Sequence, residues 1–300
     1  YLVSVLISLR YNSLILNSED TKDRAVELYE LTDVSDLPTP TEQKDMNPLE
    51  NCEYSETHLE PTYTFSPPFV AILSDITTAG VNGLAYTQNG KIIGDTVDFD
   101  TDNEIFKVNR IQRCLSRDII DSPALITSLL LTGNPTGNPA HYTRAAILHG
   151  NSHTYYQWIT YHLLKLRGIE YYKEVTGNDV HLIIPPNPPS YVIESLDLLG
   201  YGPDDYSEWD KRAATVDELV VPSFPQPTPA AIEWLRDGIL PAIETPDSNS
   251  GWIYISRQQA NQRRIANFDA LKPVLENHDI KIVELENHSL TGQIQLIQNS

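Results

Sequence analysis

The chain has 300 residues, enough for two domains of ordinary size, each with its own core. Its 41 acidic and 21 basic residues give a formal net charge of −20 at pH 7, and this excludes a general affinity for nucleic acid or anionic membrane, because both require a basic surface. Hydrophobic residues make up 40% of the chain, which favours a packed fold over a disordered acidic protein.

The first 67 residues are predicted to contain an amino-terminal strand and an acidic, partly disordered connector. Residues 1–16 form an apolar run that Arg10 interrupts, shorter than the roughly twenty residues that a membrane-spanning helix needs. We interpret this run as a buried strand or as the remnant of a membrane anchor. Residues 33–68 are rich in Asp, Glu, Pro and Thr, which favours an extended connector. Since no other segment is long and apolar enough, we expect no direct membrane span.

Short strands are predicted between residues 68 and 93, with turns at Asn82-Gly83 and Asn89-Gly90. Four aspartates follow within residues 95–103, and an Asp-x-Asp pair is able to hold a divalent metal. This run lies in a predicted turn of a generally acidic chain, so we interpret it as solvated and expect no bound metal.

Polar and aromatic side chains gather on a helix predicted to follow Asn151. His153 and Gln157 are four residues apart and share a helix face, and Asn151 precedes them; all three offer hydrogen bonds to a sugar. Trp158 either stacks on a sugar ring or packs against the sheet in the core, and the sequence leaves both readings open.

From residue 180 onward, predicted strands and helices alternate, which is typical of a mostly parallel sheet with helices on both faces. Strands are predicted at 180–184 and 216–221, and helices at 190–199 and 230–240. Prolines between 222 and 229 form a stiff linker, where we place a domain boundary.

Three arginines gather after a strand predicted at residues 253–255, before a helix that starts at about residue 267 and a strand at 280–283. The carboxyl end of a strand in an open α/β sheet is where ligands bind, and guanidinium groups suit a bidentate grip on phosphate. The alternative is a solvated loop whose arginines pair with carboxylates. The polar residues of this loop are Ser256, Arg257, Arg263, Arg264 and Asn267.

Several collinear motifs from about residue 65 onward resemble one family. They are Phe-Val-Ala-Ile-Leu-Ser-Asp at 69–75, Tyr-Tyr-Gln-Trp at 155–158 with Leu-Leu-Lys-Leu-Arg-Gly at 163–168, Leu-Asp-Leu-Leu-Gly-Tyr at 196–201, Glu-Leu-Val-Val-Pro-Ser at 218–223, Ile-Ser-Arg at 255–257, Arg-Ile-Ala-Asn at 264–267 and Ser-Leu-Thr-Gly-Gln-Ile at 289–294. Together they are similar to glycosyltransferase family 61, which includes capsular-polysaccharide transferases, in a salt-adapted, archaeal-like form.

The resemblance implies a GT-B-like α/β fold, with two Rossmann-like domains facing across a cleft. It implies an acceptor-side domain at 68–222 and a nucleotide-sugar-binding domain at 223–300. The family's His-Gly-Ala-Gly loop does not follow the 289–294 motif, so we expect the carboxyl-terminal domain to be incomplete. The implied function is inverting, metal-independent transfer of a sugar from a nucleotide-sugar donor to a glycan acceptor, in surface polysaccharide or glycoprotein glycan synthesis. No cofactor is expected.

In that scheme Arg257, with Arg263 or Arg264, neutralises the departing diphosphate, while Ser256 and Asn267 donate or accept neutral hydrogen bonds.

Gln157 stands where the family has histidine, Tyr161 where it has an acid and Leu164 where it has proline. A glutamine takes no proton near neutral pH, so His153 is the remaining candidate for a general base. The alternative function is that of a decayed or truncated family member that binds glycans or a partner without turnover.

The acid excess predicts a salt-adapted cytoplasmic protein; association with the inner face of the cell membrane is left open. If the prediction holds, the melting temperature should rise steadily as potassium chloride increases from dilute buffer to molar levels, because salt screens the repulsion among carboxylates. Calorimetry across that series checks this, and a melting temperature that does not depend on salt would contradict both the adaptation and the inferred location.

Overall fold

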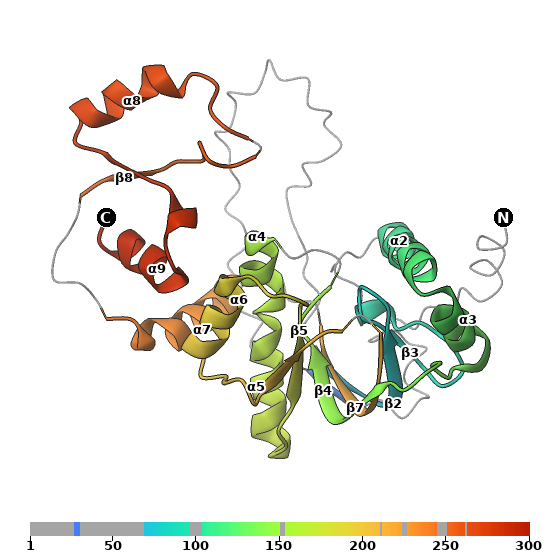
Figure 1. Ribbon diagram of the computed structural model, residues 1–300. Coiled ribbons are helices and arrows are strands. Elements are labelled where there is room, and N and C mark those ends of the chain that lie inside the picture. Colours follow the sequence, from blue (N-terminus) through green and yellow to red (C-terminus); the bar gives the residue numbers. More distant parts are fainter. Residues whose placement is uncertain are drawn as a thin grey trace. The chain divides into compact units, whose positions relative to one another are not determined.

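The computed structural model describes residues 27–30, 69–96, 104–150, 154–210, 212–223, 227–244, 251–261 and 263–300 (Figure 1). The chain divides into two compact units. The first runs to Pro186 and resumes at Asp205–Trp234; the second comprises Asn187–Asp204 and Leu235–Ser300. Within the described residues, no helix is long and apolar enough to span a membrane.

The first unit is built on a mixed seven-stranded sheet with the order β1-β2-β7-β4-β5-β6, in which β3 also pairs with β2. Strands β7, β4, β5 and β6 are parallel neighbours, as the alternation of strand and helix predicts, whereas β1, β2 and β3 add an antiparallel part. The strands are β1 Glu27–Glu30, β2 Phe69–Ala79, β3 Leu84–Tyr86, β4 Ala140–Ile147, β5 His181–Ile184, β6 Tyr206–Glu208 and β7 Ala213–Pro222.

The helical segments of this unit are η4 Gly94–Thr96, α2 Glu104–Asp121, α3 Pro123–Thr132, α4 Tyr155–Gln157, the π-helix η5 Trp158–His162, α5 Lys165–Thr176 and the first part of α7 Pro229–Ile239. Helix α5 packs directly on β7 and β2. A Cβ atom added at Gly168 would lie 3.0 Å from Cβ of Pro222 and 3.1 Å from Cγ2 of Val70, so the absence of a side chain permits this close approach.

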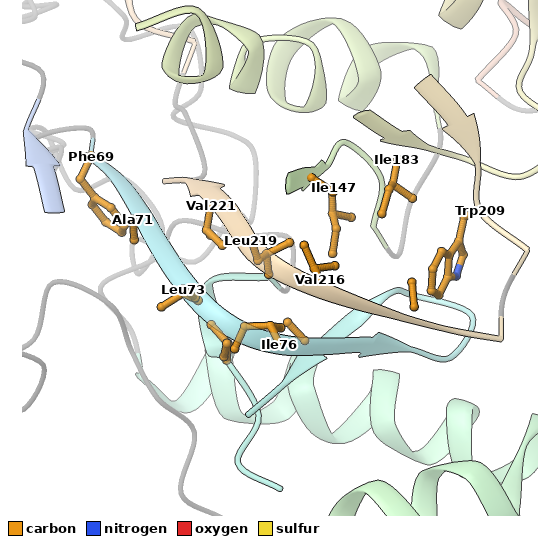
Figure 2. Packing of buried hydrophobic residues seen from close by; sticks show 14 residues of the cluster. Phe69, Ala71, Leu73, Ile76, Ile147, Ile183, Trp209, Val216, Leu219 and Val221 are labelled. Carbon is orange, nitrogen blue, oxygen red and sulfur yellow. The ribbon is translucent and has the colours of Figure 1, made fainter. Parts of the chain in front are cut away.

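The opposite face of the sheet carries the larger hydrophobic cluster (Figure 2). Strand neighbours alternate between faces: Val70 faces α5, whereas Ala71 belongs to the cluster. Leu73 and Ile76 both belong to it although they are three residues apart, because Asp75 has a φ of +55° between them.

A second cluster lies where α2 and α3 pack on β3 and the end of β2. Helix α3 ends at Gly133, whose φ is +72° and whose N–H donates to the carbonyl oxygen of Leu129. A Cβ atom at Gly133 would overlap the backbone carbonyl of Gln88, so only glycine fits where this helix end meets the turn after β3. That turn, with Gly90 at a φ of +76°, lies at the Asn-Gly pair that the sequence predicts.

The second unit contains a parallel pair of strands flanked by helices. Strand β8 (Ile253–Ile255) pairs with β9 (Lys281–Val283), and α8 (Phe268–Asn277) connects them, which confirms the predicted strand, helix and strand. The N–H of Leu290 donates to the carboxylate of Glu194 at 2.6 Å. The remaining elements are α6 Ser190–Leu198, the second part of α7, η6 Leu240–Ala242, η7 Leu285–Asn287 and α9 Leu290–Gln298.

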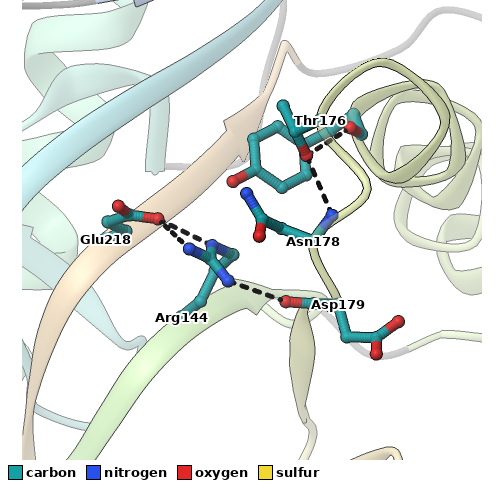
Figure 3. Close-up of polar contacts among 6 residues, drawn as sticks. Arg144, Thr176, Asn178, Asp179 and Glu218 are labelled. Atoms are coloured by element: carbon teal, nitrogen blue, oxygen red, sulfur yellow. Dashed lines mark hydrogen bonds and ion pairs between the residues drawn. The ribbon is translucent and has the colours of Figure 1, made fainter.

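One ion pair holds β4 to β7 (Figure 3). Two nitrogens of Arg144, Nε and Nη2, approach Oε2 of Glu218 at 2.7 and 2.6 Å, and Nη1 donates to the carbonyl oxygen of Asp179 at 3.4 Å. Burial lowers the pKa of Arg144, but the hydrogen bonds and charges of Glu218 and Tyr172 together outweigh it, so the net shift of the pKa is upward. The same two strands carry a second, exposed pair between His141 and Asp217.

A buried carboxylate supports the turn between β2 and β3. Asp118 of α2 is fully buried and accepts hydrogen bonds from N–H of Val81 at 2.8 Å and Nδ2 of Asn82 at 3.3 Å, both on Oδ1. Within the described residues its Oδ2 has no hydrogen-bond partner. Burial raises the pKa of Asp118 from 3.8 to about 6, against the lowering effect of the hydrogen bonds from Val81 and Asn82.

Replacing Arg144 with methionine should lower the free energy of unfolding by about 1–2 kcal/mol, because a charge-assisted hydrogen bond is lost while the apolar stem remains. His141→Gln, on the same strand, should change it by less than about 0.5 kcal/mol, because that pair is exposed. Urea unfolding of both variants measures the difference. Equal effects would show that the Arg144 pair is no stronger than a surface pair.

The raised pKa of Asp118 makes its contribution to stability depend on pH. The folded form holds the proton more tightly than the unfolded chain, so the gain is complete below pH 3.8 and is lost as pH rises through about 6. Wild type should therefore gain up to about 3 kcal/mol relative to Asp118→Asn as pH falls from 7 toward 4. Taking the difference between the two proteins removes the effect of all other carboxylates. A difference that stays constant or falls over this range would contradict the assignment.

Candidate functional site

The carboxyl ends of the parallel strands in the first unit meet at one edge of the sheet. From β4 the chain passes through α5 to β5 on one side, whereas β7, on the other side of β4, is reached only from β6 at the sheet edge. The strand order therefore reverses between β4 and β7. In open α/β sheets, ligands bind outside the strand ends at such a point.

A small cavity lies at this reversal. Its volume is about 10 Å³, room for about one water molecule. Its one basic group is Lys165, at the start of α5, which is only 5% exposed and whose Nζ donates to the carbonyl oxygen of Ile147 at 3.5 Å. The lining residues are Thr96, Ile147, Lys165, Leu219, Val220, Val221 and Pro222.

Lys165 is not among the predicted site residues, but the sequence around it carries one signal. The residue stands between Leu164 and Leu166, which are both buried, so the apolar pattern of this helix places an ammonium group in the interior. Buried ammonium groups need polar partners because desolvation is costly, and the end of β4 supplies one.

Two residues after β4, His149 is fully buried and contacts the turn between β2 and β3. Its ring stacks on Trp209, with the ring centroids 5.6 Å apart, and a Cβ atom at Gly83 would lie 2.7 Å from it. Trp209 in turn donates from Nε1 to the carbonyl oxygen of Gly80 at 2.7 Å. Side chains of the segments that follow β4 and β6 thus contact the backbone of the β2–β3 turn.

The predicted acceptor helix is present and begins at a well-formed cap. The hydroxyl of Thr154 accepts from N–H of Gln157 at 3.3 Å and contacts Oε1 of Gln157 at 2.9 Å. Asn151 and His153 lie outside the described residues. Trp158 is 1% exposed, which agrees with the core alternative; stacking of its ring on an acceptor and the catalytic roles of Gln157 and His153 stay predictions.

The predicted donor loop begins with Ser256, directly after β8. Ser256 is buried, its N–H donates to the carbonyl oxygen of Val283 at 2.7 Å, and its Oγ accepts from N–H of Gln258 at 3.2 Å. The amide of Gln258 then donates to the carbonyl oxygen of Ile265 at 3.2 Å, which joins the two ends of the loop. Ser256 thus shapes the loop in this structure.

The arginines of this loop face solvent. Arg257, Arg263 and Arg264 are exposed, and none of them forms an ion pair with another residue that the structure describes. Arg263 has a φ of +57°, a conformation uncommon for arginine. Asn267 is the N-cap residue of α8, and its side chain makes no capping hydrogen bond. The loop therefore presents three guanidinium groups and the start of a helix, all of which favour an anion.

Comparison with known proteins gives one result for this part of the chain. The family model Glycosyltransferase 61 matches residues 155–300, which contain the helix from Tyr155 onward, the β8–β9 pair and the arginine loop. No curated protein and no solved structure matches the chain. The match confirms the predicted family, suggests glycosyltransferase activity and, with it, a sugar donor and a sugar acceptor. The chain therefore carries a Glycosyltransferase 61 domain over residues 155–300.

Proposed function

We propose that the protein is a GT-B-like glycosyltransferase that moves a sugar from a nucleotide-sugar donor to a glycan acceptor, with inversion and without a metal ion. The observation that carries the proposal is the set of three exposed arginines, free of ion pairs with the described residues, in the loop after β8 of the matched domain. Location in the cytoplasm, where nucleotide sugars are made, belongs to the same proposal.

The charge balance of the chain makes this loop unusual. With 41 acidic and 21 basic residues, an exposed arginine has many carboxylates available to pair with, and Arg236 of α7 does pair with Asp237 at 2.9 Å. The loop arginines form no such pair with the residues that the structure describes, so we propose that their donors bind an anionic ligand. A diphosphate fits best, because its oxygens accept bidentate hydrogen bonds from guanidinium groups.

In the proposed reaction, Arg257 with Arg263 or Arg264 stabilises the negative charge that develops on the leaving diphosphate as the bond to the sugar breaks. The N–H groups at the start of α8, which the side chain of Asn267 does not cap, act in the same direction. The acceptor hydroxyl must lose a proton, and His153 is the proposed base, since the amide of Gln157 accepts none near neutral pH.

A second candidate function is binding of glycans without turnover, and the state of Gln157 favours it. The hydroxyl of Thr154 contacts both the backbone N–H and the side-chain Oε1 of Gln157. Gln157 therefore has a structural role at the start of the helix. Sugar transfer that is undetectable with any nucleotide sugar, together with intact nucleotide binding, would select this function.

Calorimetric titration with uridine and guanosine diphosphate tests the donor site. Arg257→Ala should weaken binding about 30-fold, equivalent to about 2 kcal/mol, because a charge-assisted phosphate contact is lost. The matched control is Arg236→Ala, which removes an exposed but paired arginine of the same unit and should leave the affinity unchanged. Equal affinities for wild type and Arg257→Ala would remove the donor-site assignment, and no nucleotide binding by wild type would contradict the transferase itself.

A further inference from the structure

The helix that was predicted to hold the acceptor exposes tyrosines while it buries its tryptophan. Tyr155 and Tyr156 are 41% and 60% exposed, whereas Trp158 is 1% exposed. Trp158 therefore presents no ring face to a ligand in this structure. Any aromatic surface that this helix offers must come from its tyrosines.

Tyr156 and Tyr161 form a defined pair. Their ring centroids are 5.9 Å apart and their planes meet at 81°, an edge-to-face arrangement. Burial and the neighbouring hydroxyl of Tyr156 raise the pKa of Tyr161, so the phenol of Tyr161 stays neutral and able to donate a hydrogen bond at physiological pH. The pair thus combines an exposed apolar ring with polar tips.

The π-helix explains how these residues meet. Residues five apart on an α-helix are separated by about 140° and lie on different faces. In η5 the N–H of Leu163 donates to the carbonyl oxygen of Trp158, five residues back, at 2.8 Å. This wider turn brings residues five apart onto nearly the same face, so it joins Tyr156 to Tyr161. The hydroxyl of Thr160 donates to the carbonyl oxygen of Tyr156 at 2.7 Å and holds the turn.

The Tyr156–Tyr161 pair lies on a helix at an edge of the sheet where ligands commonly bind. Helix α4 follows β4 in the chain at the carboxyl-terminal edge of the parallel strands, where ligands bind in open α/β sheets. π-helical turns are rare and occur frequently at functional sites. An aromatic ring that is 60% exposed contributes little to the core, and sugar rings have apolar C–H faces that such a ring can cover.

We propose that the Tyr156–Tyr161 pair is the platform on which a pyranose ring of the glycan acceptor stacks, in place of Trp158. This assignment rests on the proposed transferase function, since the matched domain supplies the reason for a sugar ligand. Tyr156 covers the apolar face of the sugar. Tyr161 fixes the orientation of Tyr156, and the amide of Gln157, next in sequence, lies within the same turn.

Saturation-transfer NMR with cellotriose and chitotriose tests the platform. Both probes are β-linked glucopyranose-type sugars whose axial H1, H3 and H5 form one apolar face. Wild type should transfer magnetisation mainly to these protons. Tyr156→Ala should reduce the transfer at least about fivefold, and Tyr156→Phe should retain it because the ring remains. Trp252→Ala is the matched control, since Trp252 is 80% exposed in the second unit, and it should have no effect.

Three results would overturn the proposal: no transfer from wild type to either probe, equal transfer in Tyr156→Ala, or equal loss in Trp252→Ala. Sedimentation of wild type and Tyr156→Ala tests whether a second copy of the chain packs on the ring of Tyr156. A dimer that the substitution dissociates would assign the ring to that contact. The titration with nucleotide diphosphates is read separately on the same proteins. Sugar binding without nucleotide binding would refute the transferase and keep the platform, whereas the reverse result would refute only the platform.

Discussion

The first unit depends on β7, the central strand of its sheet. Nine residue pairs join β7 to β2 in antiparallel register, and its other edge pairs in parallel with β4. Because β7 is almost wholly buried and bonded on both edges, it unites the amino-terminal hairpin with the α/β part of the chain. The Arg144–Glu218 pair reinforces the parallel side, and the close approach of α5 at Gly168 covers one face.

This arrangement also determines where chemistry can occur. The chain reaches the sheet edge at β6 and then returns to place β7 beside β4, which reverses the strand order at that point. The buried Lys165 lies at this reversal, and the helix with the exposed tyrosines follows β4 there. The same helix buries Trp158 and exposes Tyr156, because side chains two residues apart point to nearly opposite sides of a helix. The π-helical turn has a different effect, since it brings Tyr161 beside Tyr156.

Electrostatics distinguish the second unit. In a chain with a large acid excess, exposed arginines are expected to pair, and Arg236 does so. The loop after β8 departs from this pattern: the buried Ser256 and the bond from Gln258 to Ile265 close the loop, while its arginines face solvent. Hydrogen bonds between side chains and the backbone fix the shape of the loop, and the arginine side chains face solvent.

Local patterns were sufficient for part of this protein. Periodicity predicts the strand, helix and strand around the arginine loop, and turn chemistry predicts the turn at Asn89-Gly90. Collinear motifs predict the family. Each of these patterns acts over a few residues. No element was predicted for residues 104–147, where α2, α3 and β4 lie, although Ile111, Cys114 and Leu115 of α2 recur at helical spacing and are buried. The antiparallel pairing of β2 with β7 and the burial of Lys165, Asp118 and Trp158 depend on residues distant in sequence. The pairing of Tyr156 with Tyr161 depends on a π-helical turn. Side-chain patterns do not encode these features, so only the tertiary structure decided them.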